Sequence, residues 1–165
     1  MKQNILLTIV GHIVGIVMTV FLFAQVLNDT YLEHTLLLLL PNIGFIVYYA
    51  AVGVLCNVHQ KILTQIISLI PLSLIGLASW LFALLYTLAH KDNPFANIVW
   101  YLDWLYNVNT VLYPFFTIFQ HYAAADIFTY TAWKLLYNLF FPGIFILAGM
   151  ELKRFVLRKR GLEFD

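Results

Sequence analysis

The feature that most constrains the fold is a run of 28 residues, positions 62–89, that contains no charged side chain. A helix that crosses a bilayer needs about 20 predominantly apolar residues, so this run is long enough to span a membrane. Residues 5–27 and 35–56 have the same character, and a fourth apolar run at about 127–150 contains Lys134 in its outer part. We therefore predict an all-α, polytopic integral membrane protein built as a four-transmembrane-helix bundle.

Composition supports lipid as the surrounding medium. Apolar residues make up 62% of the 165-residue chain and charged residues 10%, whereas soluble domains have about 25% charged residues. The net charge of +1 argues against nucleic-acid binding, which needs a concentrated basic surface. The single cysteine, Cys56, excludes an internal disulfide. The first apolar run is longer than the apolar region of a cleavable signal peptide, so we expect it to be retained as a span.

Basic residues are distributed unequally between the two sides of a single four-span membrane domain, residues 1–165. With both termini inside, the inner side has seven of them and the outer side has two. The inner set is Lys2, Lys61, Lys153, Arg154, Arg158, Lys159 and Arg160, and the outer set is Lys91 and Lys134. Because cytoplasmic loops are enriched in lysine and arginine, we predict cytoplasmic N- and C-termini and a basic cytoplasmic tail over residues 151–165. The compact layout and short loops favour a bacterial cytoplasmic membrane.

The alternative to four spans is a fifth span over residues 95–119, within the segment 94–121. Crossing the membrane there would place Asp103 near the bilayer centre, at a cost of about 2.5–3.5 kcal/mol. On a helical projection of residues 95–106, the mainly apolar side chains from Phe95 to Tyr106 fall on one arc, and Trp100, Asp103 and Trp104 fall on the rest of the circle. Asn107 joins this polar and aromatic side. We therefore predict an amphipathic helix in the outer interface, between the third and fourth spans.

Polar side chains at membrane depth are the first candidates for a functional role. His12 lies about seven residues into the first span, beside Gly11 and Gly15, whose spacing favours close helix packing. The imidazole either contacts a ligand or forms a hydrogen bond across helices, and we favour the hydrogen bond. Lys134 either meets a substrate anion or Asp103, or extends its ammonium group to the outer headgroups, and we favour the second role.

The predicted outer rim contains His90 and His121 together with several acidic residues. Imidazole and carboxylate groups bind divalent metals, but the spacing here matches no metal motif, so we predict neither a metal nor a cofactor. Catalytic motifs are also absent from the sequence. The candidate ligand or partner residues are Trp100, Asp103, Trp104, Asn107, Lys134, His90, His121 and His12.

Three functions remain open, with membrane lipids as common partners. The favoured one is a non-enzymatic accessory, assembly or immunity-type subunit that binds another membrane protein, or a second copy of itself, through its spans. The second is a small oligomeric transporter, channel or lipid-handling protein with a headgroup site at the outer face. The third is an outer-face enzyme that uses Asp103, His90 or His121 as acid or base, although no nucleophile or metal completes such a site.

Overall fold

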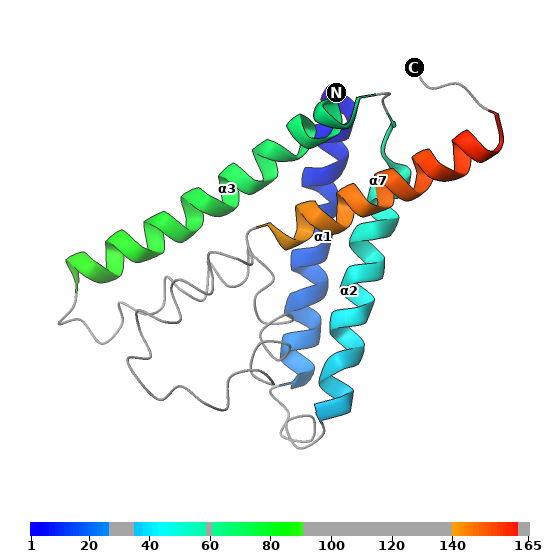
Figure 1. The fold of residues 1–165 in the computed structure, drawn as a ribbon. Helices are drawn as coiled ribbons and strands as arrows, with labels where there is room; N and C mark the ends of the chain where they lie inside the picture. Colours follow the sequence, from blue (N-terminus) through cyan, green and yellow to red (C-terminus); the bar gives the residue numbers. More distant parts are fainter. Residues whose placement is uncertain (27–34, 59–60, 91–139, 162–165) are drawn as a thin grey trace, which may run out of the picture.

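The computed structural model describes the backbone of residues 1–26, 35–58, 61–90 and 140–161, and the side chains of these residues except 22–26 and 35–42. All regular secondary structure in these ranges is helical. The four described helices, labelled as in Figure 1, are α1 (Lys2–Val26), α2 (Thr35–Leu55), α3 (Ile62–Ala89) and α7 (Phe141–Lys159). The prediction of an all-helical chain is confirmed for these residues.

Helices α1 and α2 lie side by side and run in opposite directions, and α7 packs obliquely across α2 (Figure 1). Helix α3 begins close to the N-terminus and then diverges from α1 and α2 along its length. The start of α1, the end of α2 and the start of α3 therefore lie at one end of the molecule, which we call the basic end because Lys2 and Lys61 lie there. The last turns of α7 reach toward the same end.

The contact between α2 and α7 depends on two glycines. A Cβ atom on Gly53 would fall on the carbonyl oxygen of Ile146, and one on Gly149 would fall on the carbonyl oxygen of Ala50. The two backbones therefore touch, as small residues allow in membrane helix pairs. The core formed around this crossing consists of Phe45, Tyr49, Val52, Cys56, Leu69, Leu72, Ile146 and Met150.

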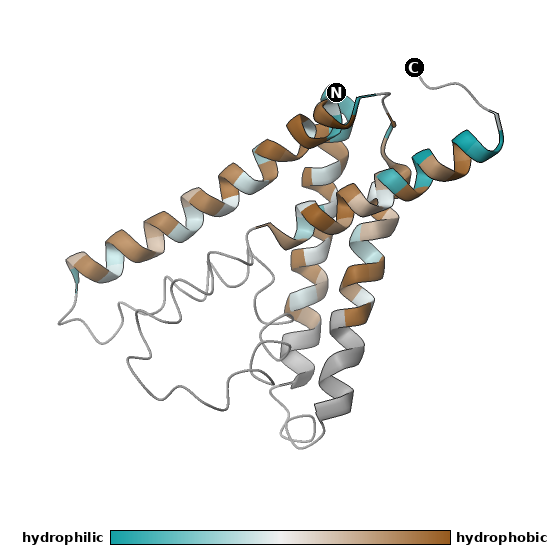
Figure 2. Ribbon diagram, in the orientation of Figure 1, coloured by the Kyte–Doolittle hydropathy of each residue, from teal (hydrophilic) through white to brown (hydrophobic). Residues whose placement is uncertain are grey.

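Helix α1 has its polar side chains inside and its large apolar side chains outside. Asn4, Thr8 and His12 are each at most 2% exposed, whereas Leu6 is 65% and Phe21 is 69% exposed. A surface helix of a soluble protein shows the opposite arrangement, with its apolar stripe turned to the core. Apolar colouring also covers most of α3 (Figure 2). This distribution suits helices surrounded by lipid, where polar and small groups hold the helices together.

Two of the predicted spans meet the requirements for crossing a membrane by length and composition: the Lys2–Phe21 part of α1 and the whole of α3. In α2 the described apolar stretch is shorter, Ile43–Leu55. Pro71 lies inside α3, which nevertheless continues as one helix.

The fourth predicted span, residues 127–150, overlaps the described helix α7 only from Phe141 onward. Pro142 lies in the first turn of α7, where its missing N–H costs no helical hydrogen bond. The helix then continues to Lys159, so the first part of the predicted tail, residues 151–165, is helical. The predicted interfacial segment, residues 94–121, lies outside the described residues.

Candidate functional site

Buried polar groups of α1 lie along the line where this helix packs on α2, which we call the polar seam. His12 Nδ1 and the Tyr49 hydroxyl share a hydrogen bond of 2.9 Å, and both residues are buried. Gly15 makes room for this pair, because a Cβ atom there would lie 2.6 Å from the Tyr49 hydroxyl oxygen. Position 15 therefore has no room for a side chain, because the Tyr49 hydroxyl of the neighbouring helix occupies the space of a Cβ atom.

A second tyrosine ties the same two helices together. The Tyr48 hydroxyl donates a hydrogen bond of 2.6 Å to the carbonyl oxygen of Gly11, and a Cβ atom on Gly11 would meet the side chain of Val52. The predicted close packing of Gly11 and Gly15 is therefore confirmed, with α2 as the helix that they contact. Tyr48 and Tyr49 were not among the predicted site residues. The partners of their hydroxyl groups depend on which face of α2 contacts α1, and the sequence does not define that face.

The environment of His12 agrees with the favoured prediction of a hydrogen bond across helices. Its ring is 2% exposed and lies 6.0 Å from the ring of Tyr49, centroid to centroid. Thr19, one turn beyond Gly15, donates its hydroxyl proton to the Gly15 carbonyl oxygen at 2.9 Å. Within the polar seam, the His12 imidazole therefore contributes to the packing of α1 against α2.

His90, by contrast, lies at the far end of α3 and is exposed. Its Nδ1 atom is 3.0 Å from the Tyr86 carbonyl oxygen, and its ring stacks on that of Tyr86 with centroids 4.3 Å apart. His90 and His12 therefore do not share a site. In the described ranges, no group of three histidine, cysteine, aspartate or glutamate side chains is placed to hold a metal ion. The other predicted site residues lie outside those ranges: Trp100, Asp103, Trp104, Asn107, His121 and Lys134.

The basic end is fastened by a set of hydrogen bonds that the sequence did not predict. The Asn4 side chain donates to the Asn57 carbonyl oxygen at 2.7 Å and accepts from the Asn57 N–H at 2.9 Å. Lys153 Nζ donates to the carbonyl oxygen of Cys56 at 2.7 Å. Backbone groups that the end of α2 leaves without a helical partner are thus satisfied by α1 and α7. The start of α1, the end of α2 and the middle of α7 are held at one level.

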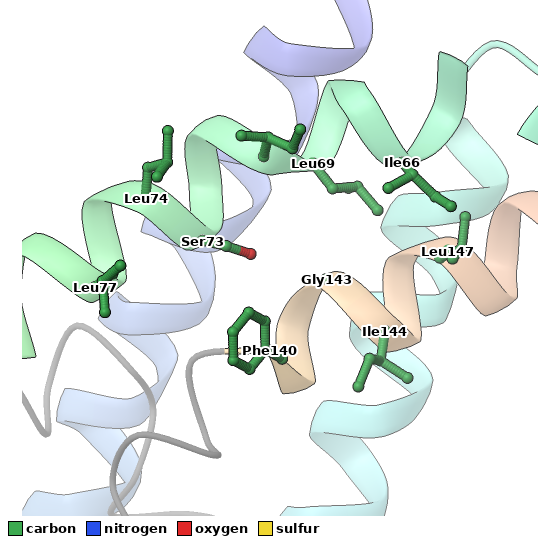
Figure 3. Close-up of a pocket in the computed structure, with 10 residues that line it drawn as sticks. Ile66, Leu69, Ser73, Leu74, Leu77, Phe140, Gly143, Ile144 and Leu147 are labelled. Atoms are coloured by element: carbon green, nitrogen blue, oxygen red, sulfur yellow. The ribbon is translucent and has the colours of Figure 1, made fainter. Parts of the chain in front are cut away.

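An apolar groove of about 370 Å³ lies between α3 and α7 (Figure 3). Ser73 points toward it from α3, opposite Gly143 of α7, and the remaining lining is hydrocarbon. The lining residues are Ile66, Leu69, Ile70, Ser73, Leu74, Leu77, Phe140, Gly143, Ile144 and Leu147. Such a surface can hold a hydrocarbon chain but offers little to a polar substrate.

Comparison with known proteins finds no matching family model, no matching curated protein and no matching solved structure.

Proposed function

We propose that the chain is a four-span protein of the bacterial cytoplasmic membrane, with both termini in the cytoplasm, that acts as a non-enzymatic accessory, assembly or immunity-type subunit. It works by binding another membrane protein through the outer surface of its helices. A second copy of the chain is the alternative occupant of the same surface.

The observation that supports this proposal is that polar side chains of α1 are buried inside the bundle and do not face its surroundings. In the described part of α1, buried polar side chains bond to the neighbouring chain segment or to their own helix, as His12, Asn4 and Thr19 do. An enzyme or a transporter needs polar groups turned toward a substrate or a path. In the described ranges these buried polar groups stabilise the bundle, and the exposed surface that α1 and α3 leave for other molecules is mainly apolar.

Helix α3 offers the surface best suited to a partner. Three leucines one turn apart, Leu81, Leu85 and Leu88, are 45%, 57% and 47% exposed, and we call them the leucine ridge. They lie in the half of α3 that has diverged from α1 and α2 (Figure 1). A helix of another membrane protein can pack against this ridge by van der Waals contact, which drives association within lipid.

Site-specific photo-crosslinking tests the proposal in the native membrane. A photoreactive amino acid replaces Leu85 in one variant and Leu6, the strongly exposed leucine of α1, in the matched control. We expect a discrete adduct with one membrane protein from position 85 and none from position 6. Replacing Leu81 and Leu88 with alanine should lower the yield at position 85 several-fold. Adducts with lipid alone, or equal yields at positions 85 and 6, would contradict the proposal.

The groove between α3 and α7 supports a second candidate, a lipid-handling protein whose groove holds one acyl chain. Purified protein reconstituted into vesicles would then move a fluorescent phospholipid between leaflets. The substitution Gly143→Leu, which fills the groove, would abolish that movement, and Gly44→Leu, at a position open to the surroundings, would not. Lipid movement in the absence of a crosslinked partner would favour this candidate over the accessory subunit.

A further inference from the structure

We propose that the basic end of the molecule is a binding surface for anionic phospholipid headgroups, formed by the last turns of α7 together with Lys2 and Lys61. The proposal goes beyond a protein partner of α3, because it concerns a different surface and a different ligand. It rests on the position of the cationic side chains, on the scarcity of acids among the described residues and on the apolar side chains beside the cations.

The cationic side chains come from three helices and lie toward the same end of the molecule. Lys2 begins α1 and Lys61 precedes α3, while the exposed Arg158 and Lys159 lie in the last turn of α7 and Arg160 follows it. The contacts of Asn4 with Asn57 and of Lys153 with Cys56 hold α1 and α7 at the level of the end of α2, and α3 begins close to the N-terminus (Figure 1). Figure 2 shows hydrophilic residues gathered at the N-terminus and at the end of α7, while the helices between them are mostly apolar.

Acidic side chains do not neutralise this end within the described residues. Glu151 is the only acid there, and it already forms an ion pair with the buried Arg154 at 3.0 Å. Glu163 and Asp165 follow in the sequence and lie outside the described residues. Lys2, Lys61, Lys159 and Arg160 are exposed and, together with Arg158, give this end a positive surface that complements a negatively charged leaflet.

Apolar side chains accompany the cations on α7. Leu152, Phe155 and Val156 form an exposed stripe, and Lys159 continues it one turn later. The Lys159 ammonium group lies 4.6 Å from the centre of the Phe155 ring. A helix end with an apolar stripe and flanking cations suits the boundary between headgroups and acyl chains. An acidic peptide or a nucleic acid in water would leave this apolar stripe exposed, so the lipid surface fits both features.

Compensation of the helix dipole does not account for this arrangement by itself. Basic residues in the last turn of a helix favourably face its carbonyl end, and Arg158 and Lys159 occupy that turn. Arg160 follows the helix, however, and Lys2 and Lys61 lie at the starts of α1 and α3, where the dipole disfavours cations. An anionic leaflet, which extends across this whole end of the molecule, accounts for all five positions.

Lipid retention by the full-length protein tests the proposal. Protein purified in a neutral detergent is mixed with phosphatidylglycerol or phosphatidylcholine of identical acyl chains, and bound lipid is counted by native mass spectrometry. We expect a preference for phosphatidylglycerol of about tenfold, which weakens as salt is raised. Chain-free glycerol phosphate at the same concentration should not displace the lipid, because the apolar stripe contributes to binding.

Two triple variants identify the side chains responsible. Changing Arg158, Lys159 and Arg160 to glutamine should reduce the preference to within about twofold, since the local cations drive it. The charge-conserving set Arg158→Lys, Lys159→Arg and Arg160→Lys should keep it. Circular dichroism and gel filtration establish that each variant is folded. Equal binding of the two lipids by the unaltered protein, an undiminished preference in the glutamine variant, or displacement by glycerol phosphate would overturn the proposal.

Discussion

The contact between His12 and Tyr49 shows how single residues hold this chain together. A histidine and a tyrosine from different helices share one hydrogen bond of 2.9 Å, and a glycine leaves space for it. In lipid the helices gain little from burying more hydrocarbon, so such bonds and close contacts carry a larger share of the association. The imidazole therefore acts first as a structural group.

Removing the Tyr49 hydroxyl measures this contribution. The substitution Tyr49→Phe keeps the ring and removes the hydrogen bond to His12, and we expect a loss of about 0.5–1.5 kcal/mol in the free energy of unfolding. Unfolding of the purified protein by a graded denaturing detergent gives this value. The control Tyr86→Phe, which removes a hydroxyl outside the polar seam, should change stability by less than about 0.5 kcal/mol. An equal loss in both variants would show that the seam bond has no special role.

At the scale of the helix, α2 and α7 cross with their backbones in direct contact. Gly53 and Gly149 each face a backbone carbonyl group of the other helix, so neither position has room for a side chain. The backbone cannot yield as a flexible side chain can, and a methyl group must push the two helices apart. The position of α7, and with it the position of Lys153 beside Cys56, depends on these two glycines.

The substitution Gly149→Ala should therefore destabilise the protein by about 2 kcal/mol or more, because overpacking at a close contact typically costs about 1–3 kcal/mol. Gly44→Ala is the matched control: it lies in α2 with nothing within 4 Å of the added methyl group. Its stability should be unchanged or higher by up to about 1 kcal/mol, since alanine favours the helix. Thermal unfolding of both variants in the same detergent compares them. Equal stability of the two would contradict the backbone contact at Gly149.

The sequence predicted the helices better than their pairing. Uncharged apolar runs located α1, α2 and α3 to within a few residues, because length and hydropathy alone define such segments. Gly11, Gly15 and His12 were predicted to lie at a helix contact, and they do. Their partners Tyr48 and Tyr49 could not be predicted, because many rotations of α2 satisfy the same apolar pattern. The Gly53–Gly149 contact joins residues distant in sequence, and no local pattern distinguishes it from the other small residues of the spans.

At the scale of the whole molecule, the described helices place polar groups inside, apolar groups outside and positive charge at one end. All three features follow if lipid surrounds α1 and α3. Apolar side chains then contact the acyl chains, polar groups form hydrogen bonds with one another, and cations lie at the interface with water and headgroups. The 28 residues of α3 correspond to about 42 Å of helix. This length exceeds the roughly 30 Å hydrocarbon core of a bilayer and connects Lys61 at the basic end to His90 at the other.

The most direct test of this account is the side of the membrane from which the two ends of α3 react. Single cysteines are introduced by Lys61→Cys or His90→Cys in a chain carrying Cys56→Ala, and are labelled with a membrane-impermeant maleimide. We predict that position 90 reacts in intact cells, and that position 61 reacts only in inverted membrane vesicles. Labelling of both positions from the same side would contradict the account, because α3 would then not cross the membrane.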